Sequence, residues 1–221
     1  MKYKYVLLDA DGTFLDFNKA EAQALRWTFE QAGLEATQEI LQCYNKINKQ
    51  MWERLERGEI TRSELRVRRF ELLGEIYPKA GAFMAQSYIE NLSKSCFFLP
   101  GGEQFLQSVC GACEVAVVTN GITVVQEGRL EIIDIKKYTK HVVISEQYNT
   151  SKPDPVLARA ALDMLGCKDK KEALIIGDSL SADIRLGINA GIDTCLLFGS
   201  SDKATYCAKD YAEALEILKS E

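Results

Sequence analysis

The chain has 221 residues, of which 47% are hydrophobic and 27% charged, a composition typical of a soluble globular protein rather than a disordered one. Its formal net charge of -5 argues against a nucleic-acid polymer or an anionic membrane as partner. No apolar stretch reaches the ~18 residues that a membrane helix needs. We therefore expect a cytoplasmic protein, a monomer or a homodimer, with one core domain and an inserted piece.

Short apolar runs recur along the chain and are typical of buried parallel strands, because they are continuous rather than alternating. The runs are residues 5–8, 115–118, 142–144, 174–176 and 194–198. From the second run onward they are separated by helix-like segments, at residues 102–109, 123–133, 155–165 and 181–190. This alternation predicts an α/β protein with a Rossmann-like parallel sheet and helices on both faces.

The long interval between the first and second runs contains no strand signal. Apolar residues from Ile40 to Leu55 follow helical spacing. Thr61-Arg62-Ser63-Glu64 has the form of a capping box, and Ala82 to Leu92 is a further amphipathic stretch. We therefore predict an all-helical domain, residues 17–92, inserted into an α/β core formed by residues 1–16 and 93–221.

Polar residues follow four of the five apolar runs. Ligands of open α/β sheets bind beyond the carboxyl ends of the strands, so these residues are expected to converge at one edge of the sheet. They are Asp9 and Asp11, Thr119 and Asn120, Lys152, and Asp178 with Asp183.

Asp9 and Asp11 are two residues apart, so their side chains lean the same way along an extended strand. Two such carboxylates repel each other unless a proton or a cation lies between them. Mg²⁺ fits, because it binds one or two carboxylates, waters and a substrate phosphate. Asp178 would complete the metal site, and Gly12 would let the chain turn sharply beside it.

The same layout supports covalent phosphoryl transfer. An aspartate can attack phosphorus to form an aspartyl-phosphate, while a second acid protonates the leaving alkoxide and later deprotonates water. Lys152 and Thr119 would hold the phosphoryl oxygens, and backbone amides after Gly121, at a helix start, would add donors. Each motif alone is a weak signal, since Asn-Gly is simply a turn. All of them in this order, each after a strand, make coincidence improbable.

In these motifs the sequence closely resembles the haloacid dehalogenase-like (HAD) superfamily. Asp9-Ala10-Asp11-Gly12-Thr13 is similar to its first motif and Thr119-Asn120-Gly121 to its second. Lys152-Pro153 is similar to the third, and the stretch from Gly177 to Asp183 to the fourth. The resemblance extends over the whole chain.

The resemblance implies that Asp9 is the nucleophile and Asp11 the general acid/base. It also implies that Asp9, the backbone carbonyl of Asp11, and Asp178 hold Mg²⁺. Haloacid dehalogenases lack an acid two residues after the nucleophile, so Asp11 favours phosphoryl transfer over carbon–halogen cleavage. Phe14, where Leu is commonest in the family, is expected to shape the pocket without harming the chemistry.

For the phosphate, the resemblance implies contacts with Thr119, Asn120 and Lys152, and Lys152 is also assigned a catalytic role. Asp183 is expected to support the metal shell or to orient Lys152. Gly12 and Thr13 are expected to support the site.

The helical insertion resembles the C1-type cap of the superfamily, which closes over the site, excludes water and selects the substrate. Stretches 47–52, 57–61 and 119–126 resemble the bacterial YjjG-type branch of nucleoside 5'-monophosphatases, which favour pyrimidine nucleotides. The resemblance thus implies a Mg²⁺-dependent 5'-nucleotidase whose partner is a small nucleoside monophosphate.

Several residues are candidates for contacting the nucleoside. Phe14, Phe17 and Trp52 could stack on a base, and Asn48 could hydrogen-bond its edge. The plainer interpretation is that Trp52 belongs to the core and that Asn48 is solvated. A basic cluster, Arg66, Arg68 and Arg69, is expected to form a solvated helix face.

Two alternatives stay open. The same fold could serve a sugar-phosphate phosphatase or a β-phosphoglucomutase-like enzyme, which retains the phosphoryl group. A protein that only binds a phosphate ligand, or a scaffold, could also keep the fold. The intact set of Asp9, Asp11, Lys152 and Asp178 speaks against this non-enzymatic alternative.

Overall fold

The computed structural model describes residues 2–219, apart from the side chain of Glu56. Residue 1 and residues 220 and 221 belong to the predicted core and lie outside the described residues. The chain divides into two compact units: Met1–Phe17 with Cys96–Glu221, called here the α/β unit, and Asn18–Ser95, called the helical unit. The sequence predicted a helical domain over residues 17–92, whereas the helical unit spans Asn18–Ser95. Within residues 2–219, no helix combines the length and the apolar character that crossing a membrane requires.

The sheet of the α/β unit is fully parallel among its described strands, with the order β3-β2-β1-β4-β5-β6. Because β1 pairs with β2 on one side and with β4 on the other, the direction of winding reverses between β1 and β4. Such a reversal is where open α/β sheets bind their ligands. The strands are β1 (Tyr5–Leu8), β2 (Glu114–Thr119), β3 (His141–Ile144), β4 (Ala173–Gly177), β5 (Asp193–Leu197) and β6 (Tyr206–Ala208).

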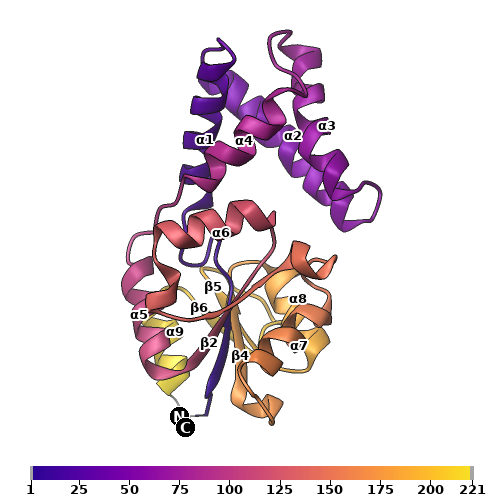
Figure 1. The fold of residues 1–221 in the computed structure, drawn as a ribbon. Coiled ribbons are helices and arrows are strands. Elements are labelled where there is room, and N and C mark those ends of the chain that lie inside the picture. The colour runs from indigo at the N-terminus through magenta and orange to yellow at the C-terminus, as the bar shows by residue number, and fades with distance from the viewer. Residues whose placement is uncertain (1, 220–221) are drawn as a thin grey trace. The chain divides into compact units, whose positions relative to one another are not determined.

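Helices cover both faces of the sheet, which confirms the predicted fold class (Figure 1). Side chains alternate between faces along a strand. On β1, Val6 and Leu8 pack with α5 and α9, whereas Leu7 packs with α7 and α8. The helices are α5 (Gly102–Ala112), α6 (Thr123–Ile132), α7 (Pro155–Met164), α8 (Arg185–Ala190) and α9 (Tyr211–Lys219). Short 3-10 turns are η1 (Ile135–Lys137), η2 (Ser145–Tyr148) and η3 (Lys170–Glu172), and η4 (Leu180–Ile184) is a π-helical turn.

The helical unit contains four helices in its described residues, and the predicted helices are confirmed in this interval. Its elements are α1 (Phe17–Gln31), which begins at the unit boundary, α2 (Gln38–Glu56), α3 (Arg62–Ile76) and α4 (Met84–Ser93). The predicted capping box begins α3: the Thr61 hydroxyl accepts a hydrogen bond from the Glu64 amide at 3.2 Å, and the Glu64 carboxylate accepts one from the Thr61 amide at 2.7 Å.

An aromatic cluster forms the centre of the helical unit. The rings of Tyr44, Phe70 and Tyr88 come from α2, α3 and α4, with centroids 5.3 to 5.7 Å apart. All three residues are almost completely buried. Contacts of this kind between three helices stabilise the unit beyond the area that they bury.

Candidate active site

The site begins where β1 and β4 end. Asp9 directly follows β1, and its amide donates a 3.0 Å hydrogen bond to the carbonyl of Ile176 in β4. Asp178 directly follows β4, and Asp183 lies in the π-helical turn η4. The Ser179 amide donates to Asp183 Oδ2 at 3.0 Å, which helps to turn this carboxylate toward the sheet. The carboxyl ends of two neighbouring strands thus supply three acids.

Lys152 supplies the positive charge at the centre of these acids. Its ammonium group contacts Asp9 Oδ1 and lies 2.7 Å from Asp183 Oδ1. It also donates to the Val118 carbonyl at 3.1 Å. Lys152 is only 3% exposed, so the ammonium group is taken out of bulk water and held by protein oxygens.

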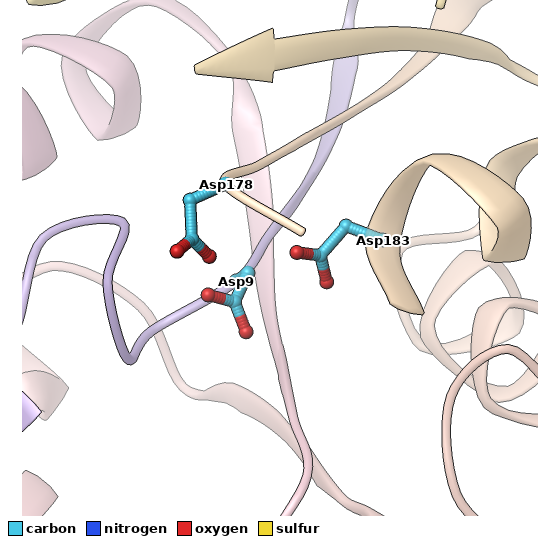
Figure 2. A group of neighbouring side chains, drawn as sticks. All are labelled: Asp9, Asp178 and Asp183. Atoms are coloured by element: carbon cyan, nitrogen blue, oxygen red, sulfur yellow. The ribbon is translucent and has the colours of Figure 1, made fainter. Parts of the chain in front are cut away.

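The carboxylates of Asp9, Asp178 and Asp183 form one acidic cluster, in which one oxygen of each lies within 4.8 Å of the others. Figure 2 shows the three groups turned toward one another. Burial and the neighbouring Asp183 raise the pKa of Asp9, although Lys152 opposes this shift. Partial burial of its carboxyl group, with Asp183 nearby, raises the pKa of Asp178 to about 6.

The three carboxylates of the cluster, two of which contact the Lys152 ammonium group, leave an excess of negative charge when all are ionised. The chemistry of this donor set fits a hard divalent cation, which prefers carboxylate oxygens and would offset the repulsion. Asp178 is exposed, unlike Asp9 and Asp183, so this side of the cluster is open to an entering ion. The residues present therefore fit Mg²⁺.

Two glycines permit this close approach of carboxylates to the backbone. A Cβ atom on Gly12 would lie 2.3 Å from Asp178 Oδ2, and one on Gly177 would lie 2.3 Å from Asp183 Oδ2. Gly12 also has a φ of +85°, which L side chains rarely adopt. Any side chain at Gly12 would therefore displace Asp178 and strain the turn after β1.

Asn120 holds the segment that carries Lys152. Its Oδ1 accepts a 2.8 Å hydrogen bond from the Lys152 amide, and its Nδ2 donates to the Lys152 carbonyl at 3.4 Å. Thr119 Oγ1, at the end of β2, accepts a 2.6 Å bond from Gln126 Nε2. Asn120 and Thr119, both predicted to bind phosphate, therefore also help to position Lys152 and Gln126, respectively.

Two backbone amides at the turn before α6 have side-chain partners. The Gly121 amide donates to Ser145 Oγ at 3.1 Å, and the Thr123 amide donates to Glu146 Oε2 at 2.8 Å. Side chains of the turn after β3 thus accept hydrogen bonds from backbone amides at the start of α6. Of the amides after Gly121 that were expected to add donors, that of Thr123 is engaged by the Glu146 side chain.

The Asp11 side chain is paired with Arg129 and lies outside the acidic cluster. Arg129 Nη2 lies 2.7 Å from Asp11 Oδ1, and Nη1 donates to Asp11 Oδ2 at 2.9 Å. Gln126 Nε2 donates to the same Oδ2 at 3.0 Å. A guanidinium therefore neutralises the Asp11 side chain.

Sequence reasoning gave no role to Arg129 or to Gln126, which ends the stretch 119–126. Arg129 is 0% exposed and Gln126 3% exposed, yet both look like ordinary polar residues of a helix. Their spacing of three places them on one face of α6, directly after the second motif. That shared face is the signal that could have identified them.

The residues beside Asp9 differ in their surroundings. Thr13 donates from Oγ1 to Asp9 Oδ2 at 2.8 Å, in a supporting position. Phe14 is 0% exposed within the core, so its ring has no free face for a base. Phe17 is partly exposed, and its ring centroid lies 5.4 Å from the Arg129 guanidinium.

Asn48 belongs to a buried polar network within the helical unit, to which α1, α2, α3 and α4 each contribute one side chain. Glu21 Oε1 accepts hydrogen bonds from Asn48 Nδ2 at 2.9 Å and from the Tyr88 hydroxyl at 2.8 Å. Asn48 Oδ1 accepts one from Arg69 Nη1 at 3.0 Å. The predictions of a solvated Asn48 and a solvated Arg69 are therefore wrong, because these residues are 6% and 2% exposed. Trp52, on α2, is partly exposed.

The family of the chain is defined by its match, over residues 6–197, to the model of the haloacid dehalogenase-like hydrolases. The chain belongs to this family.

Among its relatives is the pyrimidine 5'-nucleotidase PynA of Streptococcus pneumoniae, 38% identical over 88% of this chain and 83% of the relative. The pyrimidine 5'-nucleotidase YjjG of Escherichia coli is 32% identical over 89% of this chain and 87% of the relative. The magnesium-bound structure of the HAD-hydrolase YfnB of Bacillus subtilis covers all of both chains, with a TM-score of 0.90 and 30% identity.

Proposed function

We propose that this protein is a Mg²⁺-dependent phosphomonoesterase that hydrolyses pyrimidine nucleoside 5'-monophosphates through an aspartyl-phosphate on Asp9. The observation that carries the proposal is the meeting of Asp9, Lys152 and the acidic cluster at the carboxyl ends of β1 and β4. The similarity to PynA and YjjG, both named pyrimidine 5'-nucleotidases, supports the substrate class.

Mg²⁺ would be held by Asp9, Asp178 and the backbone carbonyl of Asp11, with Asp183 supporting this set. When bound, the cation neutralises negative charge and orients the substrate phosphate. The excess of carboxylates around Lys152 and the raised pKa of Asp178 support this assignment.

Asp9 provides the nucleophile of the first step. One of its carboxylate oxygens attacks phosphorus, the bond from phosphorus to the 5' oxygen breaks, and Asp11 gives a proton to that oxygen. Lys152 and Thr119 bind the phosphoryl oxygens as charge develops on them. Asn120 keeps Lys152 in place through the two hydrogen bonds to its backbone.

Asp11 provides the base of the second step. Its carboxylate takes a proton from water, the water oxygen attacks phosphorus, and the bond to the Asp9 oxygen breaks. Phosphate leaves and the Asp9 carboxylate is restored. Asp11 has lost one proton and regained one, so it is ready for the next turnover.

Within the described residues, the partly exposed side chains Phe17 and Trp52 stay candidates for stacking on the base. Phe14 and Asn48 are weaker candidates, because the core and the polar network of the helical unit already enclose them. We therefore expect Trp52→Ala to raise KM for a nucleotide more than KM for a small aryl phosphate.

The test of the proposal is phosphate release with Mg²⁺ from UMP, dUMP, dTMP, purine nucleotides, hexose phosphates and a generic aryl phosphate, each with a chelator control. We expect the highest kcat/KM for the pyrimidine nucleotides and loss of activity with the chelator. A preference for a hexose phosphate would contradict the nucleotidase assignment. A requirement for a bisphosphate activator, without release of free phosphate, would indicate a mutase.

A further inference from the structure

The Asp11 carboxylate is held by two side chains of α6. Arg129 approaches both of its oxygens, at 2.7 and 2.9 Å, and Gln126 Nε2 donates to Oδ2 at 3.0 Å. Gln126 Oε1 in turn accepts a 2.9 Å hydrogen bond from Arg129 Nη1. The three side chains form one connected polar group, within which Arg129 and Gln126 are buried.

We propose that Arg129 and Gln126 are positioning residues that fix the Asp11 carboxylate for acid and base catalysis. The inference rests on the proposed function, in which Asp11 exchanges protons with the 5' oxygen and with water. In this proposal neither residue touches the substrate. Both act through Asp11, and Gln126 also acts through Thr119.

The geometry supports positioning because a guanidinium that meets both oxygens of a carboxylate restricts its rotation as well as its location. The Phe17 ring lies 5.4 Å from the Arg129 guanidinium, which also limits the movement of the guanidinium. A lysine could offer charge at this place but not two planar donors. Charge alone would therefore restore only part of the effect.

Gln126 connects Asp11 to Thr119, which is proposed to bind the phosphate. Its Nε2 lies 3.0 Å from Asp11 Oδ2 and 2.6 Å from Thr119 Oγ1. One amide nitrogen thus sets the separation between the proposed acid/base and a proposed phosphate ligand. A misplacement of about 1 Å at a reacting group can cost on the order of 10²-fold in rate.

A contribution to stability alone does not account for this arrangement. Replacing a buried ion pair by apolar side chains of similar volume is often neutral or stabilising. In addition, the carboxylate of this ion pair belongs to Asp11 in the first motif, and not to a residue in a distant part of the core. These two facts favour a role in the reaction.

The two half-reactions provide a readout that general damage to the fold would not give. An aryl phosphate with a good leaving group needs little help from an acid in the first step, but hydrolysis of the aspartyl-phosphate still needs the base. If Arg129 acts through Asp11, Arg129→Met should keep a rapid first release of aryl alcohol. The steady-state rate should then fall about 10- to 100-fold.

The experiment compares the first turnover with the steady state for the wild type, Arg129→Met, Arg129→Lys and Gln126→Leu, using a nucleotide and an aryl phosphate. Arg159→Met, at an exposed position of α7, is the matched control and should behave as the wild type. We expect a lower kcat for the Arg129 variants, with partial rescue by lysine. For the aryl phosphate KM should fall together with kcat, because hydrolysis of the aspartyl-phosphate then limits turnover. Gln126→Leu keeps the buried charge, so it tests the same idea if Arg129→Met does not fold.

The second arm places Arg129→Met in an Asp11→Asn background. A positioning residue should have little further effect there, because the group that it positions is already lost. An equal loss in both backgrounds, or wild-type turnover by Arg129→Met and Gln126→Leu, would overturn the inference. A wild-type protein that hydrolyses no phosphomonoester would instead contradict the proposed function.

Discussion

The two units of the molecule bury charge in opposite ways. In the α/β unit, three carboxylates share a single nearby ammonium group, that of Lys152, and one of these acids is exposed. In the helical unit, Glu21 and Arg69 are balanced in formal charge and joined by Asn48, all of them buried. The unbalanced, partly open acidic cluster points to a ligand, whereas Glu21 and Arg69, balanced in charge inside the helical unit, point to architecture.

The largest effect is expected from Asp9→Asn in the α/β unit. Turnover should fall on the order of 10³-fold or more, because the carboxylate nucleophile is lost. The fold should persist, because the change removes one charge from a cluster that is rich in negative charge. Steady-state phosphate release and the thermal midpoint together measure this, and Asp163→Asn, exposed on α7, is the control. Turnover of the Asp9 variant at the wild-type rate would contradict the nucleophile assignment.

The next largest effect is expected from Arg69→Met in the helical unit. Removing the guanidinium takes away the hydrogen bond to Asn48 Oδ1 and a buried positive charge of this network, which should lower stability by about 3 kcal/mol. Urea unfolding monitored by tryptophan fluorescence and circular dichroism measures this loss. The neighbouring Arg68→Met, at an exposed position, should change stability little. Equal losses of stability in the two variants would contradict a stabilising role of the buried network in the helical unit.

A smaller effect is expected from Asp178→Asn. Loss of one carboxylate from the acidic cluster should raise the Mg²⁺ concentration needed for half-maximal activity by about tenfold to hundredfold. Titrating activity with Mg²⁺ after chelator treatment gives this value directly. An unchanged Mg²⁺ dependence would exclude Asp178 from the metal site.

The smallest effect is expected at the capping box of α3. Thr61→Ala removes the acceptor for the Glu64 amide and should cost about 1 kcal/mol of stability. Thr61→Ser keeps a hydroxyl at the cap and should be close to the wild type. Thermal unfolding of the two variants side by side measures the difference, and a loss with Thr61→Ser as large as with Thr61→Ala would argue against a capping role.

The α/β unit could be predicted well from the sequence because its strands are continuous apolar runs. Its polar site residues lie at the strand ends or, for Lys152, beyond a short loop. Asp9, Thr119, Lys152 and Asp178 needed only that rule to be placed near one another. β6 escaped prediction because Tyr206–Ala208 is only three residues long and contains no Val, Ile or Leu.

The buried arginines could not be predicted, because an arginine on a helix gives the same local signal whether it is solvated or buried. Arg69 and Arg129 take their environment from partners 21 and 118 residues away in the sequence. The burial of Phe14 likewise depends on core residues from other elements. Burial that depends on residues distant in the sequence cannot be predicted from the local spacing of apolar and polar residues.

The central claim is that Asp9 carries the phosphoryl group during turnover. Its most direct test is to quench the enzyme during turnover of UMP with Mg²⁺, reduce it with borohydride and map the peptides by mass spectrometry. Reduction converts an aspartyl-phosphate to homoserine, so homoserine should appear at residue 9 and be absent from a chelator-treated control. Homoserine at another aspartate, or none at all while phosphate release continues, would contradict the account.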